Sequence, residues 1–246
     1  MITKSSFTAA AFATLRLLKI YRFIAACYKA DQDIISLLLE RGADVNAARG
    51  SYHGTALQGA VEKGNQKLVE LLLGHGADVN LPDGEFGGAL QYAVKAGNLE
   101  MTRLLLERGA DVTKFCDLKP HIGASLVCLA LRFMKPGVVP LLLEHGAPLG
   151  NHPGEDTDTN SRDILSSALE VGEDMCRRLL ELGADINQAC DHGTVLHRAI
   201  ELRKSAGFIQ ELLNAGADPN VLSRWNGTPL RVSSFIYLML WTPPRT

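Results

Sequence analysis

The pattern of apolar and polar positions along this chain repeats six times. In each copy, a leucine-rich run with the i, i+3, i+4 spacing of a helix precedes a glycine and a short polar stretch. The copies occupy residues 37–46, 71–80, 104–113, 141–150, 179–187 and 212–220. Their glycines, at positions 42, 76, 109, 146, 183 and 216, are 33 to 37 residues apart. A period of this length predicts a solenoid, in which each repeat buries its apolar face against its neighbours.

One repeat, residues 54–80, shows how the pattern predicts two helices. Thr55 is a capping residue ahead of a first helix, and Gly64 is placed to end that helix. Apolar residues within 68–73 then recur at helical spacing and predict a second helix, which Gly76 terminates in a left-handed conformation. The polar stretch after that glycine is expected to turn outward as a loop. Because six similar loops do not build one convergent active site, we assign their Asp and Asn side chains to structure rather than catalysis.

These elements, in this order, resemble the ankyrin repeat family over about residues 21–230. The first helices begin with "TALQ" (55–58), "GALQ" (88–91), "TVLH" (194–197) and "TPLR" (228–231), and the second helices end in variants of "GADVN". The resemblance implies an all-α ankyrin-repeat solenoid of helix-turn-helix units with β-hairpin-like loops, about six repeats plus a partial terminal one. It also implies that His197 hydrogen-bonds between repeats, and that the array binds proteins through its loops and concave helix face. The variants "YHGTALQGA" and "FGGALQYA" are similar to ankyrin arrays of filamentous fungi.

The predicted organisation is one array with a cap at each end. Residues 1–19 are expected to form a degenerate N-terminal capping helix, although their early lysine and apolar stretch leave a secretion signal as the alternative. The array spans 20–233, with repeats ending near residues 46, 80, 113, 149, 187 and 220. Residues 234–246 are expected to be a truncated C-terminal cap or the remnant of a longer array.

Two segments depart from the repeat pattern. In the fourth repeat, Pro136 can open the second helix, but Pro140 falls inside it, where a proline costs about 3 kcal/mol. We therefore expect a late start or a kink in that helix. The polar segment 150–163 is expected to be a long mobile loop, or alternatively an acidic contact site for a basic partner.

Composition narrows the range of functions. The 246 residues carry a net charge of −2 with mixed signs, so no global field favours nucleic acid or an anionic membrane. No run approaches the roughly 18 apolar residues of a membrane span. The five cysteines are odd in number and form no Cys-x-x-Cys pair, which favours free thiols in a reducing compartment, cytoplasmic or nuclear.

No motif in the chain indicates chemistry. The chain has no phosphate-binding or dinucleotide glycine motif, no His-Glu-x-x-His and no Gly-x-Ser-x-Gly. Cys116, His121 and Cys128 come nearest to a metal cluster, but their spacing matches no common zinc pattern. We therefore expect no enzymatic activity, no cofactor and no metal.

Candidate partner-binding residues are those that repeat packing does not dictate. By family geometry, the two positions that end each first helix face the concave side, and the loop tips add aromatic and basic side chains, the usual types at binding hot spots. The candidates are Tyr52, His53, Glu62, Lys63, Phe86, Lys95, Arg132, Phe133, Glu170, His192, Glu201, Arg224 and Trp225. For each one a solvated surface residue is the alternative, and Tyr52 and Phe86 have the further alternative of packing between adjacent loops.

The sequence therefore predicts a non-enzymatic protein–protein interaction module, an adaptor or scaffold that is monomeric and binds neither nucleic acid nor membrane. Its expected mechanism is a large, pre-formed surface, which loses little conformational entropy on binding. Two alternatives stay open. One is the ankyrin-repeat fragment of a larger multidomain signalling protein, and the other is a regulator that occludes the active site of an enzyme.

Overall fold

The described part of the chain folds into helices. A computed structural model describes residues 32–47, 54–82, 87–113, 125–149, 164–190, 192–224 and 227–232. These residues form eleven α-helices, one short 3-10 helix and no strand. The chain divides into two compact units, Met1–Val112 and Thr113–Thr246.

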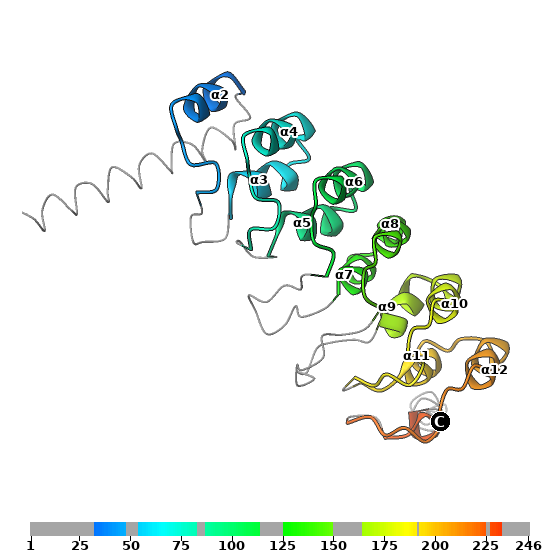
Figure 1. Ribbon diagram of the computed structural model, residues 1–246. Helices are drawn as coiled ribbons and strands as arrows, with labels where there is room; N and C mark the ends of the chain where they lie inside the picture. Colours follow the sequence, from blue (N-terminus) through cyan, green and yellow to red (C-terminus); the bar gives the residue numbers. More distant parts are fainter. Residues whose placement is uncertain are drawn as a thin grey trace, which may run out of the picture. The chain divides into compact units, whose positions relative to one another are not determined.

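The N-terminal unit contains α2 (Gln32–Glu40) and two helix pairs. The pairs are α3 (Ala56–Glu62) with α4 (Gln66–Gly74), and α5 (Ala89–Ala96) with α6 (Leu99–Glu107). Helix α3 packs against both α4 and α5, and α5 packs against α6. Figure 1 shows α3 and α5 side by side in one layer, with α4 and α6 in the other. The first helix of a repeat is thus followed by a second helix that packs on it, as the pattern predicts.

The C-terminal unit repeats this arrangement with three pairs. They are α7 (Leu126–Arg132) with α8 (Val139–Glu144), α9 (Ile164–Val171) with α10 (Glu173–Glu181), and α11 (Val195–Glu201) with α12 (Ala206–Asn214). Helix α9 packs against α7, α10 and α11. The first helices α7, α9 and α11 form one layer, and the second helices α8, α10 and α12 form the other (Figure 1).

One leucine in each second helix forms the centre of the packing. It stands four residues before the glycine of the repeat and is 0% or 1% exposed in five helices. These residues are Leu72, Leu105, Leu142, Leu179 and Leu212. Because complete burial of a leucine side chain is worth about 1.5–3 kcal/mol relative to exposure, this recurrent position makes a large contribution to the stability of every pair.

The helix ends follow the predicted capping chemistry. The Thr55 side chain accepts a hydrogen bond from the Gln58 amide and caps α3. After α3 the chain turns at Gly64 (φ +69°), and after α4 it turns at Gly76 (φ +85°). Both glycines adopt the left-handed region in which a side chain is disfavoured, so the sequence prediction for both turns is confirmed.

The second helix of the fourth repeat starts late, as its two prolines predict. Pro136 opens a 3-10 turn, η1 (Pro136–Val138), and the α-helix begins only at Val139. Pro140 therefore lies in the first turn of α8, where no helical hydrogen bond needs its missing N–H. The cost of a mid-helix proline is avoided by shortening the helix.

The predicted β-hairpin-like loops are reduced, in the described residues, to two isolated antiparallel bridges. These join Cys190 to Gly193 and Ser223 to Gly227. The predicted terminal caps at 1–19 and 234–246, and the long loop at 150–163, lie outside the described residues.

Candidate protein-binding surface

Asparagine side chains connect the loops of neighbouring repeats. Asn80 Nδ2 donates to the Gly109 carbonyl at 2.9 Å, and Asn80 Oδ1 accepts from the Asp111 amide at 2.8 Å. Equivalent pairs of bonds join Asn46 to Gly76 and Asp78, and Asn187 to Gly216 and Asp218. Four loop aspartates, Asp44, Asp78, Asp185 and Asp218, also accept from the amide two residues ahead. These bonds confirm that the repeated Asp and Asn side chains serve the structure.

Gln58, on the first helix α3, connects its own cap to the loop of the next repeat. Its Oε1 accepts from the Thr55 amide at 2.9 Å, and its Nε2 donates to the carbonyls of Leu81 and Gly87 at 3.0 and 2.9 Å. The side chain is 1% exposed, so these polar groups satisfy one another away from water. Gly54 leaves room for this arrangement, because a Cβ there would lie 1.8 Å from Gln58 Oε1.

His197 performs the same task on α11, as the family resemblance implies. Its Nδ1 lies 3.1 Å from the Thr194 amide, which donates to it, so Nε2 carries the proton and donates to the Gly227 carbonyl at 2.9 Å. A Cβ at Gly193 would lie 2.4 Å from the His197 ring, which explains the glycine ahead of this cap. The buried imidazole is therefore a structural connector between repeats.

Two of the predicted binding residues are paired within the chain. Arg198 on α11 donates through Nη2 to Glu170 on α9, and through Nη1 to Glu201 at 2.9 Å. Partial burial disfavours the charge of Arg198, but the hydrogen bonds and charges of both glutamates outweigh it and raise the pKa of the guanidinium. Glu170 thus helps to hold the first helices of adjacent repeats together, and Glu201 orients Arg198 from within α11.

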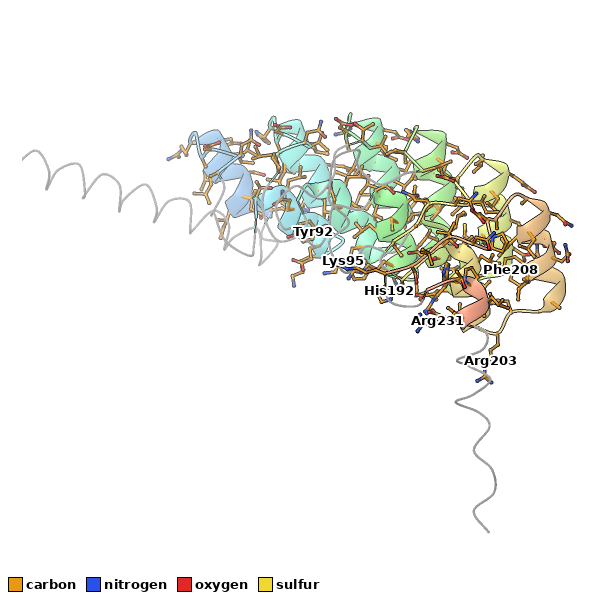
Figure 2. All side chains as sticks on the ribbon, turned by 90° about the horizontal axis from the view of Figure 1, so that it is seen from below. Tyr92, Lys95, His192, Arg203, Phe208 and Arg231 are labelled. Atoms are coloured by element: carbon orange, nitrogen blue, oxygen red, sulfur yellow. The ribbon has the colours of Figure 1, made fainter. Side chains whose placement is uncertain are left out.

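The second helices of the same two repeats are connected by Arg177. This arginine on α10 donates through Nε to Glu211 on α12 at 2.8 Å, and its guanidinium lies 5.2 Å from the ring centroid of Phe208. It also pairs with Glu173 and Asp174 on its own helix. The hydrogen bond to Glu211 is the main cause that raises the pKa of Arg177. Figure 2 shows Phe208 among the side chains at this end of the C-terminal unit.

The other predicted binding residues in the described part of the chain lie at the ends of first helices and on loops. Glu62 and Lys63 end α3, Lys95 lies in the last turn of α5, Arg132 and Phe133 end α7, and His192 and Arg224 lie on loops. Of these, Lys95 and Phe133 are half-buried and the others are exposed. Figure 2 labels Lys95 and His192. Tyr52, His53, Phe86 and Trp225 lie outside the described residues.

Sequence reasoning missed two residues beside these positions. Met134 (φ +56°) and Arg203 (φ +53°) adopt the left-handed conformation that glycine takes at the equivalent turns, Gly64 and Gly97. Met134 is 56% exposed, and Arg203 projects away from the helices in Figure 2. The available signal was a missing glycine, since both residues occupy a slot where other repeats carry one.

The described residues show no grouping that suggests chemistry. They contain no cluster of three metal-ligating side chains. In the same part of the chain, no helix has the length and apolar character that a bilayer crossing requires. Cys128, Cys176 and Cys190 are buried and form no disulfide bond, and the Cys190 thiol donates to the Gly193 carbonyl.

Comparisons with known proteins agree with this architecture. Residues 57–106 match the family described as ankyrin repeats (many copies), residues 127–223 match ankyrin repeats (3 copies), and residues 23–49 match a single ankyrin repeat. The chain is similar to the crystal structure of the human ASB11 ankyrin repeat domain, with 22% identity and a TM-score of 0.64. That alignment covers 91% of this chain and 99% of the other. No curated protein matches the chain.

Proposed function

The chain belongs to the ankyrin repeat family, whose all-helical domains generally act as protein-interaction modules and are typically non-catalytic, and we propose that it is a non-enzymatic adaptor or scaffold for a protein partner. The proposed contact surface consists of the ends of the first helices and the loops ahead of them. It includes all thirteen candidate residues of the sequence analysis. Glu170 and Glu201 contribute less than the others to partner binding, because both carboxylates already pair with Arg198.

One contrast supports this proposal. The inward positions of the repeats are almost uniform, with a completely buried leucine in each second helix from α4 to α12. The helix-end positions differ in every repeat, for example Glu62 and Lys63 on α3 against Arg132 and Phe133 on α7. Variation that packing does not require, carried on a fixed scaffold, is the usual source of binding specificity in repeat proteins.

We further propose that the protein acts as a monomer in the cytoplasm or nucleus. Cys128, Cys176 and Cys190 form no disulfide bond, which supports a reducing compartment, because reduced thiols persist where disulfides do not form. Light scattering after size exclusion tests the first statement, and a fluorescent fusion of the full chain tests the second.

An affinity experiment with matched variants tests the binding function. The full chain is used as bait in lysate, beside a surface variant Lys95→Ala/Arg132→Ala and a control variant Lys67→Ala/Arg103→Ala. The control residues are exposed on the second helices α4 and α6. We expect a partner that the wild type and the control retain and the surface variant loses, while all three give the same circular dichroism spectrum. A partner lost equally by both variants, or none retained by the wild type, contradicts the proposal. Capture of an enzyme that the chain inhibits would identify a regulator.

A further inference from the structure

We propose that the C-terminal ends of α7, α9 and α11 form a docking stripe for a short acidic protein segment with apolar anchor residues. The docking stripe consists of Phe133, Met134, Val171 and Leu202, with Arg132, Lys135 and Arg203 beside them. This inference rests on the proposed binding function and specifies the chemistry of the partner.

The stripe carries larger apolar side chains than the equivalent positions of the N-terminal unit. Met134 is 56% exposed and Leu202 is 37% exposed, and Val171 is half-buried between them in the chain. The positions equivalent to Val171 and Leu202 at the ends of α3 and α5 hold Lys63 and Ala96, and the position equivalent to Met134 holds Gly64 and Gly97. Exposed large apolar side chains on either side of a half-buried valine in one layer of helices indicate a surface that another molecule covers.

The three helix ends are neighbours in space. Helix α9 packs against α7 on one side and α11 on the other, and the three lie in one layer (Figure 1). Packed helices are about 8–10 Å apart, so the stripe is about 16–20 Å long. An extended segment rises about 3.3 Å per residue, so about five or six residues of a partner reach from one end to the other.

Backbone strain at the stripe is a second, independent observation. The turn that follows a first helix holds glycine in the left-handed region at Gly64 and Gly97, but the stripe keeps side chains there, Met134 and Arg203. The left-handed conformation costs a residue with a Cβ roughly 1–2 kcal/mol, a cost that glycine avoids. Met134 is 56% exposed and Arg203 is also exposed, so neither side chain is buried in return for this cost, which favours a use for both side chains outside the fold.

The charges left available at the stripe are positive. The carboxylates near it already contact cations: Glu170 and Glu201 share the single guanidinium of Arg198, and Glu173 contacts Arg177 and Lys204. Among the described residues, exposed Lys135 and Arg203 make no ion pair or side-chain hydrogen bond. Arg132 has none either, but it also complements the dipole at the end of α7, so the other two cations carry the argument.

The occupant that fits is therefore acidic and partly apolar. Carboxylates on a partner segment would pair with Lys135 and Arg203, and its apolar side chains would cover Met134 and Leu202. Such pairs at the rim of an interface increase the association rate and select the partner by charge, and the apolar contacts supply most of the affinity.

A peptide selection on the full chain tests this chemistry. A random octapeptide library on phage is selected against the wild type, and the enriched peptides are synthesised with a fluorescent label. We expect peptides with net negative charge and at least two large apolar residues, whose affinity falls as salt is raised. Affinity should fall about tenfold or more in Met134→Ser/Leu202→Ser and in Lys135→Glu/Arg203→Glu. The matched control Arg178→Glu, exposed on the second helix α10, should stay within about twofold.

Glycine substitutions separate the functional role from a structural one. Met134→Gly and Arg203→Gly remove the strain, so each should raise Tm by about 2–4 °C in a chain of this size. The same variants should weaken peptide binding, because they delete the contacting side chains. Higher stability with unchanged binding would assign no function to these side chains and would overturn the inference.

Other outcomes of the selection also decide the question. Enrichment of neutral or basic peptides, failure to enrich any peptide, or affinities insensitive to the stripe variants would each contradict the docking stripe. So would tighter, stripe-dependent binding of a labelled single-stranded RNA or of phosphatidylserine vesicles. If the wild type retains a partner in the lysate experiment and the stripe variants bind the same partner, the proposed binding function stands and only the docking stripe is wrong. If the lysate experiment retains none, both proposals are wrong.

Discussion

Replacing Gln58 by alanine should lower the free energy of unfolding by about 3 kcal/mol. The side chain is 1% exposed and makes three hydrogen bonds, to the Thr55 amide and to the carbonyls of Leu81 and Gly87. Thr55 and Gly87 are buried, so each loses a partner where water does not replace it, at about 1–3 kcal/mol per group. Leu81 is half-buried, and the loss of its bond costs less because solvent reaches its carbonyl.

Two matched variants isolate this effect. Gln66→Ala removes an exposed glutamine on α4 whose one hydrogen bond is to Glu70, so stability should change by less than about 0.5 kcal/mol. Gln58→His should be intermediate, near 1 kcal/mol by our estimate, because a ring oriented like His197 accepts from the cap and donates to one carbonyl but not to two.

Urea denaturation followed by circular dichroism measures the three free energies. Hydrogen exchange then locates the change, which should centre on α3 to α6, because repeats interact mainly with their neighbours. The reasoning is refuted if Gln58→Ala costs no more than Gln66→Ala, or if Gln58→His is more damaging than Gln58→Ala.

Three further predictions follow from the packing and the loops. Gly54→Ala should cost about 2 kcal/mol or more, since the added Cβ meets Gln58 and φ is +58°. Its control is Gly74→Ala on α4, where nothing lies within 4 Å, and which should raise stability by about 0.5–1 kcal/mol in a thermal melt. Leu72→Ala should cost about 2–5 kcal/mol in urea denaturation, because the side chain is 0% exposed, and a smaller loss would mean that the core relaxes around the cavity. Thr113→Asn combined with Pro148→Asp should gain about 1 kcal/mol by installing the missing asparagine connection, with each single change giving less.

The helix pairs were predictable because their determinants are local. Thr55 caps α3 and Pro140 delays α8 through contacts within a few residues, which the sequence displays directly. The role of His197 was also predictable, but only through the family resemblance, since its acceptor Gly227 lies 30 residues away. Gln58, which acts in the same way, carries no such signal in its residue type.

The binding surface was less predictable because side-chain pairing depends on the register between repeats. Glu170 and Glu201 occupy helix-end positions that read as free surface, yet both reach Arg198. The Glu170 pair depends on how α9 packs against α11, which no local pattern in the sequence specifies, whereas Glu201 lies three residues after Arg198 on the same helix. Met134 and Arg203 were missed because the sequence shows only that glycine is absent at these two turns. That the backbone nevertheless adopts the left-handed conformation there is known only from the dihedral angles.

The central claim is that this chain binds a protein through the ends of its first helices. Hydrogen exchange of the full chain, with and without the partner retained in the lysate experiment, tests it most directly. We predict new protection at the C-terminal ends of the first helices and the turns that follow them, chiefly residues 132–135 and 201–204, with the second helices α10 and α12 unchanged. Protection confined to the second helices, or no change on addition of the partner, would contradict the account.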